Sequence, residues 1–150
     1  TLGGVYKLSA VRASSEEAWT DRLKISESAA KLTFPGILDV RRYYHEDGSI
    51  AGDMVFDVNN GVRAEEIIVD PVDDMRQKKL CGKRFDTLLR PLARKDRSAM
   101  LARERVQLGL DALDETQLRM LNPHTYPVGL EFGLNERRRE LVARLRGISR

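Results

Sequence analysis

Several residue types and patterns are scarce in this 150-residue chain, and each scarcity excludes a class of protein. Cys81 is the only cysteine, so no disulfide can form within the chain, and a reducing, cytoplasmic setting is expected. No apolar run approaches the roughly 20 residues that a membrane-spanning helix needs. Aromatic residues make up only 6% of the chain, and few lie among the basic residues, which disfavours a nucleic-acid-binding module.

Motifs for metal binding and catalysis are also scarce. His45 and His124 are the only histidines, and neither has a second His or Cys at metal-ligand spacing. His45 lies in a predicted turn and His124 follows an Asn-Pro pair, so we expect both side chains to be exposed to water. The sequence therefore predicts no catalytic residue and no metal ligand among these 150 residues.

Charged residues are abundant, at 33%, and they are unevenly distributed. The first 75 residues contain 8 Lys and Arg against 14 Asp and Glu, whereas the last 75 contain 18 against 9. Opposite net charges favour packing of the two halves against each other or against a complementary subunit. A phosphate-binding surface for nucleic acid is the alternative interpretation of the basic half. We expect an ordinary charged face or a protein interface.

The first part of the chain, residues 1–95, is predicted to be rich in strands. Apolar residues alternate with period two, as on the buried face of a strand. The expected strands lie at residues 6–10, 23–25, 38–44, 54–58, 67–69 and 85–92. His45–Gly48 is a good hairpin turn, because glycine accepts the positive φ that such turns need. Residues 70–84 are polar and are expected to be mostly a connection.

The remaining part, residues 96–150, is predicted to be helical. Ala99, Ala102, Val106, Leu110 and Leu113 recur at spacings of three and four, which is one stripe of a helix. A short helix is expected to open at Asp114, bury Leu118 and Leu121, and stop at Asn122-Pro123. A final helix carries Leu134 to Leu145, with its arginines mostly on the exposed side. The two parts, 1–95 and 96–150, together predict one domain-sized unit of the α+β class.

Lysines of the opening region are the sharpest candidates for binding. Lys7 interrupts a half-apolar strand, and Lys24 and Lys31 flank a Ser/Glu segment. Cations at defined places on a sheet can bind a phosphate group or a partner carboxylate. The alternative is that these side chains simply face water from an alternating strand.

Three segments, in this order, resemble the C-terminal part of nicotinate phosphoribosyltransferase. They are Leu2–Leu8 with the sequence LGGVYKL, Leu23–Gly36 with LKISESAAKLTFPG, and Asn122–Leu130 with NPHTYPVGL. The similarity extends over nearly the whole chain and is loosest over residues 60–95. One departure is Glu131, which stands near the place where family members usually have a Ser opening the last helix. The start at Thr1, rather than Met, leads us to expect a fragment of a longer chain.

The resemblance implies a function for the longer chain. The family forms nicotinate mononucleotide from nicotinate and phosphoribosyl diphosphate, in the salvage route to NAD. ATP hydrolysis drives the reaction through a phosphorylated histidine, with Mg²⁺ assisting. The family fold, a type II phosphoribosyltransferase, combines an irregular α/β barrel with a mixed sandwich to which the chain returns. Residues 1–150 resemble that return segment and the C-terminal helices.

The resemblance also implies where the reaction takes place. The phosphate loop, the phosphohistidine and the base-binding residues of the family precede the segment seen here, and neither His45 nor His124 falls at the phosphohistidine position. We therefore expect residues 1–150 alone to be inactive and to bind neither ATP nor Mg²⁺. The expected partners are the upstream barrel portion and a second subunit in a homodimer. Lys7, Lys24 and Lys31 remain the candidates for contact with a shared substrate site.

Two alternatives stay open at this point. The basic half of the chain could make it a binding module for nucleic acid or an acidic protein. The parent enzyme could instead be a related phosphoribosyltransferase that uses nicotinamide or quinolinate, because the base-binding residues are not within this sequence.

Overall fold

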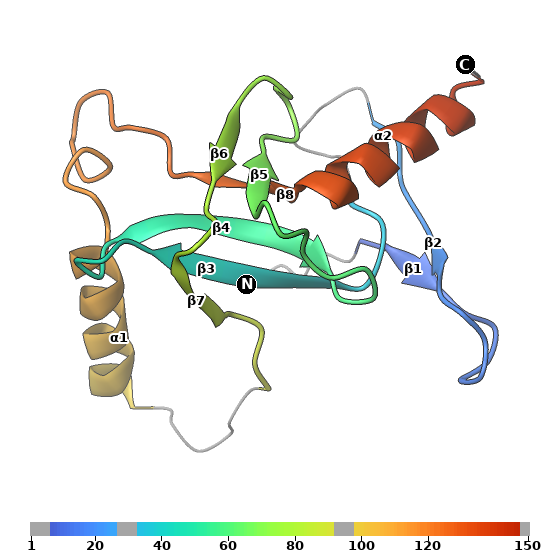
Figure 1. Ribbon diagram of the computed structural model, residues 1–150. Helices are drawn as coiled ribbons and strands as arrows, with labels where there is room; N and C mark the ends of the chain where they lie inside the picture. Colours follow the sequence, from blue (N-terminus) through green and yellow to red (C-terminus); the bar gives the residue numbers. More distant parts are fainter. Residues whose placement is uncertain (1–6, 27–32, 92–97, 148–150) are drawn as a thin grey trace.

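Strands fill the first part of the chain and most helical residues lie in the last third, as the sequence predicts (Figure 1). The structure, a computed structural model, describes residues 7–26, 33–91 and 98–147. Within these ranges the chain forms a six-stranded sheet, a two-stranded sheet and two α-helices. Neither helix has the length and apolar character needed to cross a lipid bilayer.

The centre of the large sheet is a hairpin of β3 (Leu38–Tyr44) and β4 (Ile50–Asp57). Its turn spans the predicted residues, and Gly48 has the expected positive φ, at 86°. Cross-strand neighbours such as Arg41 and Met54 pair in antiparallel register. The predicted hairpin is therefore confirmed.

The other strands extend this hairpin into a mixed sheet. The strand order is β6 (Gln77–Lys79), β5 (Ile67–Val69), β8 (Val128–Glu131), β4, β3 and β7 (Arg84–Thr87). Most neighbours are antiparallel, but β8 runs parallel to β4. The strand predicted at 67–69 is confirmed. The strand predicted at 85–92 is confirmed only as far as Thr87, because residues 88–91 are not in a strand, and residue 92 lies outside the described ranges. Residues 70–84, expected to be mostly a connection, also contain β6, which the sequence did not predict and which pairs with β5.

A small hydrophobic core lies on one side of the large sheet. Its buried members come from β3, β4, β5 and the residue that follows β6, and they are Tyr43, Ala51, Met54, Ile68 and Leu80, with Val62 packed against them. The phenol of Tyr43 donates a hydrogen bond of 3.0 Å to Glu66, so its polar end is satisfied. Burial of these side chains holds the short strands to the hairpin.

The two-stranded sheet consists of β1 (Ala10–Val11) and β2 (Thr20–Asp21), which pair antiparallel. The strand predicted at residues 23–25 does not form. Instead, the backbone N–H of Lys24 donates to the hydroxyl of Thr33, at 2.6 Å. The N–H of Lys24 is thus bonded to a side chain and not to the backbone carbonyl of a neighbouring strand.

The first helix, α1 (Ala99–Asp111), forms where the apolar stripe predicts it. The short helix expected after Asp114 does not form. The carboxylate of Asp114 accepts the backbone N–H of Thr116, at 2.8 Å, which closes a turn in competition with a helix. Leu118 and Leu121 are 49% and 83% exposed, so the expectation that they are buried is wrong.

The final helix, α2 (Phe132–Leu145), follows β8 directly and packs against β5 and β8. Its first turn is capped by Glu131, whose carboxylate accepts the backbone N–H of Leu134 at 2.8 Å. The helix buries one arginine, Arg138, and half-buries the preceding one, Arg137. The prediction that its arginines lie mostly on the exposed side is therefore wrong for these two residues.

Candidate functional site

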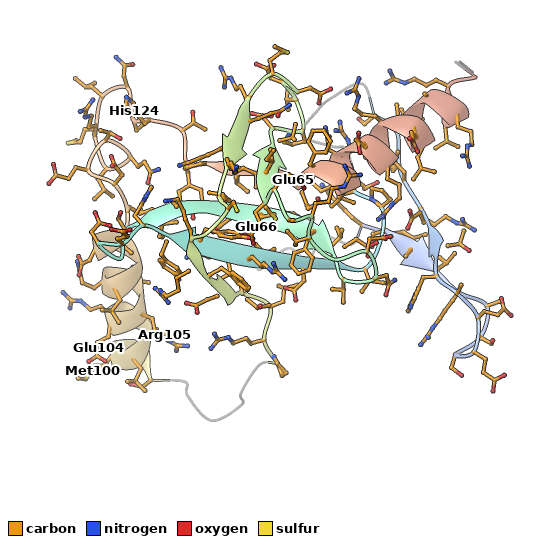
Figure 2. All side chains as sticks on the ribbon, in the orientation of Figure 1. Glu65, Glu66, Met100, Glu104, Arg105 and His124 are labelled. Atoms are coloured by element: carbon orange, nitrogen blue, oxygen red, sulfur yellow. The ribbon has the colours of Figure 1, made fainter. Side chains whose placement is uncertain are left out.

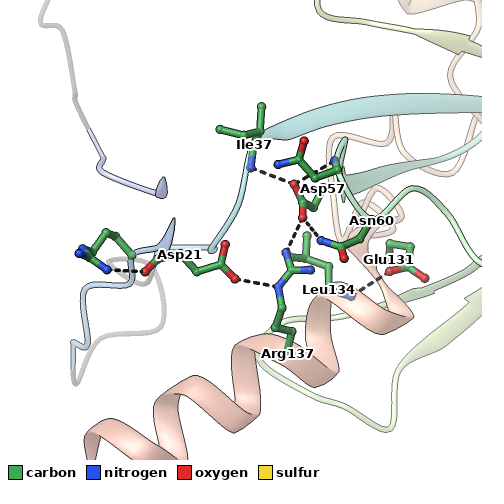
Figure 3. Close-up of polar contacts among 9 residues, drawn as sticks. Asp21, Ile37, Asp57, Asn60, Glu131, Leu134 and Arg137 are labelled. Atoms are coloured by element: carbon green, nitrogen blue, oxygen red, sulfur yellow. Dashed lines mark hydrogen bonds and ion pairs between the residues drawn. The ribbon is translucent and has the colours of Figure 1, made fainter. Parts of the chain in front are cut away.

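An ion-pair network joins α2 to the end of the central hairpin (Figure 3). Asp57 is the last residue of β4, and its side chain is only 3% exposed. The guanidinium of Arg137 donates through Nη2 to Asp57 Oδ2, at 2.7 Å. The same guanidinium lies with Nε 2.9 Å from Asp21 Oδ2, in β2. One arginine thus connects the large sheet, the small sheet and α2.

The carboxylate of Asp57 is held by further hydrogen bonds. Its Oδ1 accepts the backbone N–H of Ile37, at 2.9 Å, and its Oδ2 accepts the side-chain amide of Asn60. Burial alone would raise the pKa of Asp57, but the bonds from Asn60, Ile37 and Arg137 outweigh it and lower that pKa below its ordinary value. Asp57 is therefore an ionised, fully partnered acid with a positional role.

The turn that ends the LKISESAAKLTFPG segment rests directly on this network. Gly36 has a φ of 105°, and a Cβ placed on it would lie 2.8 Å from Asp57 Cγ and 2.9 Å from Arg137 Nη2. Both the backbone angle and the lack of space require glycine at this position. The Pro-Gly pair singled out in the sequence thus lets the turn approach the buried ion pair closely.

Three stretches of chain converge at one backbone carbonyl beside this network. The carbonyl oxygen of Ser9 accepts the N–H of Arg22, at 2.8 Å, and the N–H of Gly36, at 3.0 Å. Lys7 lies two residues before Ser9, and Lys24 lies two residues after Arg22; both lysines are exposed. Lys31, the third candidate, lies outside the described residues. The structure thus brings the segments of two of the three candidate lysines to one place.

An open groove of about 910 Å³ lies next to the network. It runs between the β2 region and the C-terminal part of α2, and it includes Trp19, Arg22, Arg144 and Leu145 among its lining residues. Trp19 is 41% exposed, and the guanidinium of Arg12 stacks 4.5 Å from its ring centre. The lining combines apolar side chains with three arginines, Arg22, Arg137 and Arg144, and two acids, Asp21 and Asp57, which pair with Arg137.

A second polar cluster lies at the junction of the central hairpin with the Tyr-Pro-Val segment. Arg42 and Asp53 form a two-point ion pair, with Nε–Oδ1 at 2.9 Å and Nη2–Oδ2 at 2.8 Å. Burial, and then the Asp53 charge, raise the pKa of Tyr126 above its ordinary value. Tyr126 therefore stays neutral at physiological pH and can act only as a polar, uncharged group.

Neither histidine belongs to these clusters. His124 lies in the loop between α1 and β8, away from Glu65 and Glu66 on the β5 side (Figure 2). His45 is exposed, with Nδ1 3.2 Å from Lys83 Nζ. In the ranges that the structure describes, no three His, Cys, Asp or Glu side chains gather as a metal site would require.

Sequence reasoning missed the two most connected residues, Asp57 and Arg137. They are 80 positions apart, so no local pattern links them. One signal was available for the arginine. Arg137, Arg138 and Arg139 are successive, and residues in a helix turn by about 100° each, so three in a row span about 200°. Arg138 lies four positions after Leu134 and three and four positions before Leu141 and Val142, so helical spacing places it on the apolar stripe.

Comparison with known proteins agrees with the sequence resemblance. Residues 39–137 match the family model described as the nicotinate phosphoribosyltransferase C-terminal domain. No curated protein matches the chain. A crystal structure of human nicotinic acid phosphoribosyltransferase is similar, with a TM-score of 0.53 and 25% sequence identity. The similarity covers 74% of this chain but only 24% of that one, so this chain spans about a quarter of the solved protein.

Proposed function

Because this chain belongs to the nicotinate phosphoribosyltransferase C-terminal domain family, we propose that it is the closing portion of an enzyme that forms nicotinate mononucleotide. The α+β architecture is that of part of a type II phosphoribosyltransferase fold. The proposed reaction joins nicotinate to phosphoribosyl diphosphate, releases diphosphate and is driven by ATP hydrolysis. The product enters NAD synthesis in the cytoplasm.

The observation that carries this proposal is the extent of the family match. It runs from the second residue of β3 into α2 and so includes all of the central hairpin except Leu38, together with β8 and the Asp57–Arg137 link. Phosphoryl and ribosyl transfer need preorganised charge around diphosphate and Mg²⁺. The described residues offer no group of three metal-binding side chains. We therefore propose that ATP and Mg²⁺ act on the upstream portion, and that residues 1–150 complete the fold and its subunit contacts.

A homodimer and an upstream barrel are the partners in this proposal. Lys7, Lys24 and Lys31 precede residue 39, where the match to the family model begins. Their contact with a shared substrate site is therefore proposed from the sequence segments in which they lie and not from the family match. Nucleic acid is not among the proposed partners. Arg137 and Arg139 of the basic half pair with Asp57 and Asp74 of the acidic half, which uses part of the positive charge internally.

Turnover of two proteins tests the proposal. The intact enzyme, with its upstream portion, should convert nicotinate, phosphoribosyl diphosphate and ATP to nicotinate mononucleotide, measured by chromatography. Residues 1–150 alone should form none. Equal or faster turnover with nicotinamide or quinolinate would assign a different base to the enzyme, and product from residues 1–150 alone would contradict an upstream reaction centre.

A retardation assay separates the enzyme from a nucleic-acid-binding module. We expect residues 1–150 to leave a labelled oligonucleotide unshifted at physiological salt. Tight binding that falls steeply as salt rises would instead favour the binding module, because neutralised phosphates release counterions.

A further inference from the structure

The Asp57–Arg137–Asp21 network connects rigid parts of the fold to the segments that carry the candidate lysines. We propose that Arg137 is a positioning residue: it fixes these segments so that Lys7 and Lys24 can meet a phosphate group of a substrate. This inference rests on the proposed function, and it adds a residue of α2 to the side chains that determine substrate affinity.

The rigid end of the connection is the carboxylate of Asp57. It is 3% exposed and ends a strand at the centre of the large sheet. Arg137 meets it at 2.7 Å, so the helix and the sheet share one anchored pair. Breaking such a buried pair from one side leaves an uncompensated charge, which makes the arrangement hard to distort.

The other end of the connection reaches the small sheet. Arg137 Nε lies 2.9 Å from Asp21 Oδ2, and both side chains are 25% exposed. Nη2 donates a hydrogen bond to Asp57, whereas the contact of Nε with Asp21 is an ion pair without hydrogen-bond geometry, so this second contact limits the distance between β2 and α2 but does not fix their orientation. Arg137 thus adds a side-chain link between β2 and β4 to the backbone bond from Gly36 to Ser9.

From β2 the constraint passes to the lysine-bearing backbone. Arg22, next to Asp21, donates its N–H to Ser9, and Gly36 donates to the same carbonyl. Two residues of chain reach at most about 7 Å, so the Cα atoms of Lys7 and Lys24 lie within about that distance of Ser9 and Arg22. Thr33 adds a direct bond to the backbone of Lys24, at 2.6 Å. Both lysines therefore branch from one cross-linked point.

The chemistry of an ammonium group selects the ligand. Lysine is a compact point charge that binds phosphate, and its binding gains when the backbone that carries it is held in advance. Two of the substrates of the proposed reaction, phosphoribosyl diphosphate and ATP, carry phosphates. Because Arg137 acts through the lysines and not on the reacting atoms, its loss should weaken substrate binding more than it slows the chemical step.

The test measures steady-state kinetics of the intact enzyme for each substrate in turn. Arg137→Gln should raise KM for phosphoribosyl diphosphate or for ATP about tenfold, with kcat within about twofold and KM for nicotinate unchanged. Which KM rises identifies the phosphate donor that the lysines meet. Arg137→Lys keeps the charge and should recover part of the loss. Arg139→Gln on the same helix is the matched control and should leave every KM unchanged, because its exposed pair with Asp74 lies elsewhere.

A double-mutant cycle separates positioning from general stability. If Arg137 acts through Lys24, Arg137→Gln combined with Lys24→Ala should raise KM no further than Lys24→Ala alone. Additive effects, or a lower Tm with every KM unchanged, would overturn the inference. Asp21→Asn supplies a second route if the arginine variant folds poorly, because it removes only the more exposed contact and should raise the same KM. A wild-type enzyme without nicotinate mononucleotide activity would instead refute the proposed function itself.

Discussion

The two helices of this chain are almost equal in length, yet they relate to the rest of the molecule in opposite ways. α1 has 13 residues and α2 has 14. α2 buries Leu134, Asn135 and Arg138, whereas α1 buries none of its residues in the described part of the chain. In Figure 1, α2 lies beside β5 and β8, and α1 points away from the sheet.

The difference teaches that helix formation and helix docking have separate causes. α2 continues from β8, so its first turn starts inside the sheet layer, and Arg138 Nη2 then donates to the carbonyl of Pro71 at 2.9 Å. α1 is joined to the hairpin by a backbone bond of 2.8 Å between Ile50 N–H and the carbonyl of Ala112. Its apolar side chains, including Leu108 at 70% exposure, remain in contact with solvent.

The largest difference in stability is expected between substitutions of one leucine in α2 and one leucine in α1. Leu134 is 1% exposed and Leu108 is 70% exposed. Leu134→Ala should lower the free energy of unfolding by about 3 kcal/mol, since it loses apolar burial and leaves a cavity. Leu108→Ala should change it by less than about 0.5 kcal/mol. Urea unfolding followed by circular dichroism measures both. A large loss of stability for Leu108→Ala would show that the apolar side chains of α1 are covered in the protein, and would contradict the difference between the two helices.

Glycine-to-alanine substitutions in β8 and in α1 are expected to change stability in opposite directions. A Cβ on Gly129 in β8 would lie 2.7 Å from the carbonyl oxygen of Val69, which is backbone and cannot turn aside. Gly129→Ala should therefore cost about 2 kcal/mol of stability. A Cβ on Gly109 in α1 meets nothing within 4 Å, so Gly109→Ala should stabilise by about 0.5–1 kcal/mol through helix propensity. The same unfolding curves decide, and equal signs would contradict the description of one region as packed and the other as open.

Local signals made part of the fold predictable. The β3–β4 hairpin has alternating apolar residues around a turn with Gly48, so the pattern and the turn agree. β6 was missed because Gln77–Lys79 is polar and its pairing depends on β5, several residues away. The residues of β8 stand out in the sequence as part of a motif but not as a strand. The place of β8 between β5 and β4 depends on partners about 60 and 75 positions earlier.

The candidate site divides in the same way. The sequence made Lys7 a candidate because it interrupts a half-apolar segment, and Lys24 because it flanks a Ser/Glu segment; their binding role stays a prediction. The convergence of their segments at Ser9 could not, because hydrogen bonds between distant backbone groups leave no trace in composition. Asp57 reads in the sequence as one acid before a turn, and only its contact with Arg137, 80 residues away, gives it a role.

The smallest expected effect is a pH dependence of the free energy of unfolding, which arises from the contact of Asp57 with Arg137 of α2. The folded-state pKa of Asp57 is lowered, so its charge stabilises the fold above the unfolded-state pKa of about 3.9. That contribution is lost as pH falls through the still lower folded-state pKa. Asp57→Asn should therefore be less stable than the wild type at pH 6, and the gap should narrow below about pH 4, measured by urea unfolding at each pH. The other carboxyl groups titrate in both proteins, so the difference isolates Asp57. A gap that stays constant from pH 6 to pH 3 would mean that the shape of Asp57, not its charge, holds Arg137 and α2 in place.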